Sequence, residues 1–382
     1  DAPVARPAAR AAALAASDGT FDPVRMYLRE IGKVPLLTAE QEVMEEEVPF
    51  MQLVAKRLVR DNMGFGKFTG GKDPLDSFAW SGTRRGNFVT LGYDTRAYHG
   101  KDESAHPHAL PDAVAYAEST AEVAAIVKLC VQHRVPLIPF GAGSSVEGHV
   151  LAIHGGVALD LTRMNRVLAI HVDDLDATVQ AGVTRKQLNA EIKDTGLFFP
   201  IDLGANPSIG GMIAANTGGA RLVKYGDVRQ NLLGLRAVLM HPAGEVLDLQ
   251  TALRKNNTGP DLKQLFVGSS GAYGIITRAV LQVHRIPKQT ATALVVPRDQ
   301  AAVLELLSVL ERDCSEFLSA FEGVSGAALQ AVLKHIPSIS NPFAPEPVPH
   351  YCVLLELAST ADPQVTGIDL ESVLMRCLEN LF

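Results

Sequence analysis

Three runs rich in glycine and hydroxyl-bearing residues constrain this sequence more than any other feature. The first, Gly141 to Gly148, directly follows the apolar segment VPLIPF, which predicts a strand. The second run spans Gly204 to Gly219, and the third spans Gly268 to Gly274. Glycine lets the backbone approach a ligand closely and adopt positive φ values, and Ser and Thr hydroxyls supply hydrogen bonds. The runs therefore predict backbone loops wrapped around one large, anionic ligand.

The pattern around these runs mixes strands and helices without the fingerprint of a doubly wound dinucleotide fold. The glycine spacing of the first run departs from that fingerprint, and no helix-opening pattern follows it. Ser119 and Glu122 form a capping box that opens a helix to about His133, and Gly196 closes a helix that begins at Thr184. LRAVLM and EVLDL, joined by HPAG, predict a hairpin. The mixture predicts an α+β domain over 98–287.

Composition excludes several classes of protein. The 382 residues are 47% apolar and 20% charged, which is typical of a globular chain, and the net charge of −7 does not favour a nucleic-acid partner. No apolar run approaches the length of a membrane span. The four cysteines stand far apart, which predicts no disulfide framework, no metal site and a reducing compartment. Cytoplasmic location is the expectation, with peripheral membrane association or organelle import left open.

The rest of the chain divides into segments that differ in composition and predicted secondary structure. Residues 1–17 are an Ala/Pro-rich tail, 18–60 a short helical segment, and 61–97 an irregular linker. Residues 288–382 continue as a second α+β unit, in which QAAVLELLSVLERD and GAALQAVLKHI predict helices and HYCVLLELAS predicts a buried strand. The chain stops inside a predicted helix, so this unit is expected to be partial.

Two segments resemble known families. DPVRMYLREIGKVPLLTAEQEV resembles region 1.2 of primary bacterial sigma factors over about two dozen residues, and we interpret it as a grafted or chance fragment. VPLIPFGAGSSVEGH is similar to D-lactate dehydrogenase (cytochrome) and the glycolate oxidase flavoprotein subunit. PIDLGANPSIGGMIAANTGG and LRKNNTGPDLKQLFVGSSG are similar to D-2-hydroxyglutarate dehydrogenase. About half the chain thus resembles FAD-linked D-2-hydroxyacid dehydrogenases of the vanillyl-alcohol oxidase/p-cresol methylhydroxylase superfamily.

The resemblance implies a two-subdomain FAD-binding domain of p-cresol methylhydroxylase type, followed by a substrate (cap) domain. It implies noncovalent FAD, since no histidine attachment motif is present, with the pyrophosphate on the first run and the isoalloxazine near the second. The chain departs from the family at Ser270, Ala272, Tyr273 and Pro260, in and before the third run. The implied cofactor-binding residues are Pro139, Gly141, Ala142, Gly143, Ser144, Ser145, Gly148, His149, Gly204, Ser208, Gly210, Gly211, Ala215, Asn216, Thr217, Gly218, Gly271, Ile275 and Ile276.

The implied reaction oxidises a small 2-hydroxy acid to the 2-oxo acid by hydride transfer to the flavin; the electron acceptor stays open. Arg254, with Thr258 and Lys263, is implied to hold the substrate carboxylate, and a solvated basic pair is the alternative. The family's late His-rich motif does not occur before Phe382, so the catalytic base is not assigned. Two alternatives stay open: an FAD-binding fragment without that base, and a transcription-associated binding module acting through the sigma-like segment.

Overall fold

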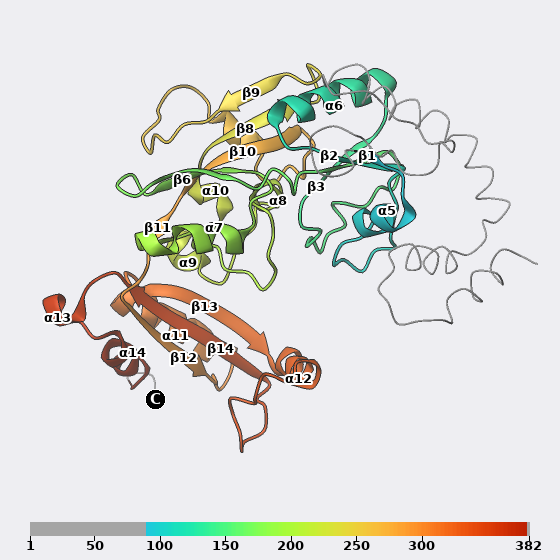
Figure 1. The fold of residues 1–382 in the computed structure, drawn as a ribbon. Helices are drawn as coiled ribbons and strands as arrows, with labels where there is room; N and C mark the ends of the chain where they lie inside the picture. The colour runs from blue at the N-terminus through green and yellow to red at the C-terminus, as the bar shows by residue number, and fades with distance from the viewer. Residues whose placement is uncertain (1–88, 380–382) are drawn as a thin grey trace, which may run out of the picture. The chain divides into compact units, whose positions relative to one another are not determined.

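The computed structural model describes residues 89–379, all within the unit Lys56–Phe382 (Figure 1). The predicted tail, the sigma-like segment and most of the predicted linker lie outside the described residues. The described part is mixed α+β, as expected. Its sheets fall into two groups along the chain, before and after Pro287. No helix of the described part is long and apolar enough to cross a bilayer.

The first sheet carries the strand that leads into the first glycine run. Its order is β1 (Val89–Thr90), β2 (Ala113–Tyr116), β4 (Val157–Asp160), β3 (Leu137–Phe140). Strands β2, β4 and β3 are parallel, whereas β1 pairs antiparallel with β2. Helix α6 (Thr120–His133) begins as predicted, with Ser119 Oγ accepting from the Glu122 N–H. The Glu122 carboxylate instead accepts from the N–H of Glu118, one residue further out than a capping box requires.

The linker prediction needs one correction. Within 61–97 the structure has β1 and most of α5 (Tyr93–His99), so this stretch is not irregular throughout. The buried His99 fixes α5 to the sheet: its Nε2 lies 2.8 Å from Asp160 Oδ2, and its ring centroid lies 4.3 Å from that of Phe140. Regular secondary structure thus begins before residue 98.

The second sheet is antiparallel and contributes to a large hydrophobic core. Its order is β5 (Val167–His171), β6 (Asp176–Gln180), β10 (Gly274–Gln282), β8 (Leu232–Leu239), β9 (Val246–Leu249). The predicted β8–β9 hairpin is present. Helices α7 (Arg185–Ile192), α8 (Ile209–Ala215) and α10 (Val228–Asn231) contribute Leu188, Ile213 and Val228 to the core. Strands β7 (Leu197–Phe198) and β11 (His284–Arg285) form a separate two-stranded sheet.

The third sheet, in order β12 (Gln289–Val295), β14 (Tyr351–Ser359), β13 (Leu318–Ser325), forms the C-terminal part. Alternate residues of β14, Val353, Leu355 and Leu357, pack in one core with α11 (Gln300–Cys314) and α14 (Leu370–Glu379). The intervening Glu356 is therefore on the opposite face. Helices α12 (Gly326–His335) and α13 (Pro363–Thr366) complete this part, and the short α9 (Leu222–Tyr225) contacts β13.

Candidate FAD site

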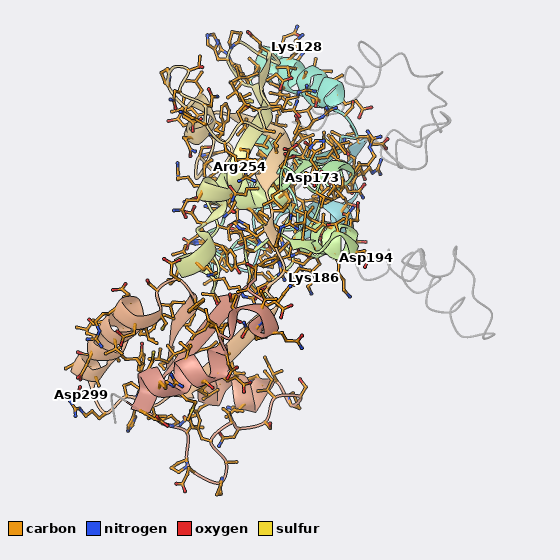
Figure 2. All side chains as sticks on the ribbon, turned by 90° about the vertical axis from the view of Figure 1, so that its left-hand side faces the viewer. Lys128, Asp173, Lys186, Asp194, Arg254 and Asp299 are labelled. Atoms are coloured by element: carbon orange, nitrogen blue, oxygen red, sulfur yellow. The ribbon has the colours of Figure 1, made fainter. Side chains whose placement is uncertain are left out.

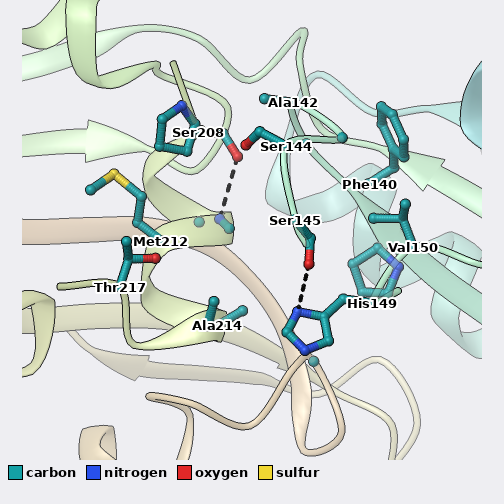
Figure 3. Close-up of a pocket in the computed structure, with 18 of the residues that line it drawn as sticks. Phe140, Ala142, Ser144, Ser145, His149, Val150, Ser208, Met212, Ala214 and Thr217 are labelled. Carbon is teal, nitrogen blue, oxygen red and sulfur yellow. Dashed lines mark hydrogen bonds between the residues drawn. The ribbon is translucent and has the colours of Figure 1, made fainter. Parts of the chain in front are cut away.

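A cavity of about 450 Å³ opens where the three glycine-rich runs meet (Figure 3). This volume is within the range of small-molecule and cofactor sites. Among the predicted cofactor residues, Gly148, Asn216 and Gly218 do not line it. Those that do are Pro139, Gly141, Ala142, Gly143, Ser144, Ser145, His149, Gly204, Ser208, Gly210, Gly211, Ala215, Thr217, Gly271, Ile275 and Ile276.

The first run turns sharply at the end of β3 because two of its glycines adopt left-handed conformations. Gly143 has φ +62°, and a Cβ there would lie 3.0 Å from Phe140 Cζ. Gly148 has φ +76° and packs against the His106 ring, which explains why it turns the loop without lining the cavity. Both positions are strained for any residue with a side chain.

The second run forms a loop and then helix α8. Ser208 is the N-cap residue: its Oγ accepts from the Gly211 N–H at 3.3 Å. A Cβ on Gly210 would lie 2.8 Å from Ala181 Cβ, so the glycine lets α8 pack directly on the segment after β6. Asn216 ends the helix with φ 49°, and its Nδ2 donates to Asp227 Oδ2 at 3.1 Å. Asn216 thus has a structural role that the sequence did not reveal.

The third run is joined to the first by His149. The Nδ1 atom of this ring lies 3.2 Å from Ser145 Oγ, and its Nε2 lies 3.3 Å from Ser270 Oγ (Figure 3 shows the first contact). Gly271 has φ +83°, and a Cβ there would lie 3.0 Å from Pro139 Cγ. The sequence singled out both Gly271 and His149, but it could not show that the histidine bridges two runs.

The cavity lining suits a large ligand with an apolar ring system and an anionic group. Among its lining residues only Glu147 and His149 are titratable, so no lysine or arginine neutralises an anion there. Backbone N–H groups of glycine-rich turns and the hydroxyls of Ser144, Ser145 and Thr217 remain as partners. Sequence reasoning missed the apolar lining residues Phe140, Val150, Leu161, Ala181, Leu203 and Met212. FAD, with its pyrophosphate and planar isoalloxazine, fits this donor set.

The predicted substrate residues do not line the cavity. Arg254 Nη2 donates to the carbonyl oxygens of Asp174 at 2.7 Å and Leu175 at 3.2 Å (Figure 2 labels Arg254 and Asp173). Thr258 is exposed, and Lys263 Nζ lies 2.6 Å from Asp261 Oδ2. All three residues thus lie outside the lining of the cavity, and their role stays a prediction.

Comparison with known proteins gives two family matches. Residues 111–250 match the family described as FAD binding domain. This range includes the first two glycine-rich runs. Residues 22–44 match sigma-70 factor, region 1.2.

The full-length relatives are D-lactate and D-2-hydroxyglutarate dehydrogenases by name. The chain is 42% identical to "Probable D-lactate dehydrogenase, mitochondrial" of Danio rerio over 229 residues. This aligned stretch covers 58% of this chain and 45% of that protein. Over 266 residues it is 34% identical to "Probable D-2-hydroxyglutarate dehydrogenase, mitochondrial" of Oryza sativa subsp. indica, or 69% of this chain and 47% of that protein. The chain thus spans about half the length of these curated relatives.

A solved structure of alkyldihydroxyacetonephosphate synthase is similar in fold, with a TM-score of 0.61 and 22% identity over 77% of this chain and 57% of that one. At this identity the match supports the fold alone.

Proposed function

The chain contains an FAD binding domain and is related to FAD-linked D-2-hydroxyacid dehydrogenases, and from this we propose that it oxidises a D-2-hydroxy acid to the 2-oxo acid. The substrate class is that of D-lactate, glycolate or D-2-hydroxyglutarate. When bound, FAD supplies the acceptor for the hydride that leaves the substrate Cα. The electron acceptor that reoxidises the flavin is not part of this proposal.

The convergence of the three glycine-rich runs on one cavity carries the proposal. The first run would hold the pyrophosphate, since its backbone turns at Gly143 and adjoins Ser144 and Ser145. The second run and the apolar residues Ile275 and Ile276 would hold the isoalloxazine. The chain's own residues would thus bind and orient FAD without a covalent bond, and exclude water from the ring.

The test begins with the colour of the purified full chain. We expect stoichiometric FAD that is released intact by denaturation, and that is bleached anaerobically by D-lactate, glycolate or D-2-hydroxyglutarate. L-Lactate is the matched control and should not reduce the flavin. A chain that binds no FAD would overturn the proposal.

A second candidate is an FAD-binding module that lacks the catalytic base. Within residues 89–379 it is favoured by the small number of titratable residues that line the cavity, Glu147 and His149, and by the placement of Arg254 outside it. Bound flavin that no hydroxy acid reduces would support this candidate.

The sigma-like match at residues 22–44 favours a third candidate, a transcription-associated binding module. Binding of the full chain to bacterial RNA polymerase core, lost on deletion of residues 1–60, would support it. We also propose a reducing compartment, the cytoplasm or an organelle interior, because all four cysteines are free and buried.

A further inference from the structure

A bidentate ion pair joins the end of the second glycine-rich run to the C-terminal sheet. Arg221, the N-cap residue of α9, donates from Nε to Glu356 Oε1 at 2.9 Å and from Nη2 to Oε2 at 3.2 Å. Ser319 on β13 adds a hydrogen bond from its Oγ to Glu356 Oε1 at 2.6 Å. The Glu356 side chain is only 17% exposed and that of Arg221 32%, so water screens the pair less than a surface pair.

Arg221 also contacts Asp202, which directly precedes a residue that lines the FAD cavity. Its Nη1 is 3.7 Å from Asp202 Oδ2, and Asp202 Oδ1 accepts from Arg185 Nη1 at 3.1 Å. Arg185 in turn donates from Nη2 to the carbonyl oxygen of Leu203, which lines the cavity. A Cβ on Gly219 would lie 2.5 Å from the Asp202 carbonyl oxygen, so the two backbone segments of the wall are in direct contact.

The contact region between Arg221 and the C-terminal sheet, here called the junction, contains empty space beside the ion pair. A second cavity of about 380 Å³ lies there, lined by Arg221 and Glu356 together with Phe198, Ile286 and Pro287 among others. Because a cavity forfeits packing contacts, directed polar contacts matter more for holding the junction together. A further contact from α9 is a hydrogen bond that Lys224 Nζ donates to the Glu316 carbonyl oxygen at 2.5 Å.

Arg221 and Glu356 each stabilise the charged form of the other. Burial by itself would raise the pKa of Glu356, but the hydrogen bonds from Arg221 and Ser319 lower it overall. The hydrogen bond that Arg221 donates to Glu356 raises the pKa of Arg221 despite burial. Removal of Arg221 would leave the half-buried Glu356 carboxylate without this counterion, whereas removal of Glu356 would leave Arg221 with the longer contact to Asp202 at 3.7 Å. Loss of a half-buried pair destabilises a structure more than loss of an exposed pair.

We infer that Arg221 and Glu356 are positioning residues that fix the C-terminal sheet against the wall of the FAD cavity, so that cofactor affinity depends on a carboxylate outside that cavity. The inference rests on the proposed function in one respect, that the cavity takes FAD. The path runs from Glu356 through Arg221 and Asp202 to Leu203, and from Arg221 along the backbone to Thr217. Both ends of this path, Leu203 and Thr217, line the cavity.

The test is FAD titration of the full chain, followed by flavin fluorescence, with Glu356→Gln. This change keeps the side-chain shape and removes the charge, and we expect the Kd for FAD to rise about tenfold. Asp362→Asn is the matched control, because it breaks an exposed pair with Lys288 at 3.1 Å in the same sheet region. The control should leave the Kd unchanged.

Three further variants make the outcome decisive. Arg221→Met combined with Glu356→Gln should be no weaker in FAD affinity than the worse single variant, since both act through one contact. Arg221→Lys and Ser319→Ala should show smaller increases in Kd, and they serve if Glu356→Gln fails to fold. An unchanged Kd in these variants, even with a lowered melting temperature of the FAD-free chain, would overturn the inference. A wild-type chain that binds no FAD would instead overturn the proposed function.

Discussion

Gly141 lies so close to Ser208 that a methyl group on its Cα would stand 2.2 Å from the serine hydroxyl oxygen. The first and second glycine-rich runs therefore touch, although Gly141 and Ser208 lie 67 positions apart in the sequence. Ser208 is buried, and its hydroxyl is engaged in capping α8. Glycine at 141 is thus required by space, because no positive φ is involved at this position.

Gly141→Ala tests this contact. The added methyl would displace the Ser208 hydroxyl from the Gly211 N–H, and loss of an N-cap costs about 1 kcal/mol of stability. Because the two runs must also separate, we expect FAD affinity to fall at least about tenfold. Thermal unfolding and FAD titration measure the two effects.

The control for this prediction is a second change in the same background. Ser208→Gly removes the obstructing oxygen, and glycine is a tolerable N-cap residue. The double variant should recover most of the FAD affinity that Gly141→Ala loses. A double variant no better than the single one would contradict the steric explanation.

Local chemistry accounts for the parts of the fold that the sequence predicted. Ser119 and Thr184 cap their helices with side-chain oxygens, and Gly196 ends a helical segment with φ 75°. These contacts join residues that are a few positions apart, so the local sequence pattern is enough to predict them. The glycine-rich runs were recognisable for the same reason, and the structure brings their residues to one cavity.

The missed elements depend on contacts distant in sequence. Strand β13 contains Glu322 and Gly323, which are poor signals for a strand, and it exists because it pairs with β14. Strand β12 alternates Thr and Ala and lies on the other side of β14. The hydrogen bonds of Arg254 to Asp174 and Leu175 also join parts of the chain that are distant in sequence, so neither the residue type nor the family resemblance could reveal them.

Arg254→Met tests the proposed carboxylate clamp. The guanidinium now meets two neutral carbonyl oxygens at an exposed site, and a carboxylate is a stronger partner for it. If the clamp forms, its loss removes a charge-assisted contact of about 1.5–3 kcal/mol, and acid binding should weaken roughly ten- to a hundredfold. Titration of the flavin spectrum with D-lactate, D-2-hydroxyglutarate and oxalate measures it, and FAD content should not change.

Lys255→Met is the matched control, since it removes a neighbouring cation without an expected role. Acid affinities that are equal in wild type and Arg254→Met would remove Arg254 from the substrate site. Its two hydrogen bonds would then be purely structural.

His284 predicts a pH dependence of stability. Burial, and next the positive charge of Arg254, lower its pKa from 6.5 to about 4. Its Nε2 is 2.8 Å from Asn231 Oδ1, and since Asn231 Nδ2 donates to the carbonyls of Tyr225 and Asp227, that oxygen accepts from a neutral ring. Below pH 6.5 the unfolded chain binds a proton that the folded chain refuses, so the free energy of unfolding falls as the pH drops towards 4.

After allowance for solvent screening we expect His284 to contribute about 1–2 kcal/mol to this fall. His284→Gln keeps a donor for Asn231 but does not titrate, so its stability should vary less between pH 7 and pH 4.5 in urea unfolding. Other groups titrate in both proteins, and the difference between the two profiles isolates His284. Parallel profiles would show that folding does not change the pKa of His284.

The cysteines should be inert in the folded chain. Burial raises the pKa of Cys130 to about 12, and burial together with the nearby Cys377 raises that of Cys314 to about 12. At pH 8 the thiolate fraction is then about one in ten thousand, against roughly a quarter for an unperturbed thiol. Ellman's reagent should therefore label no cysteine quickly in the native protein and all four after denaturation. Val131→Cys, at an exposed position of α6 beside Cys130, should add one fast-reacting thiol; fast labelling of Cys130 itself would mean that α6 opens readily from the sheet.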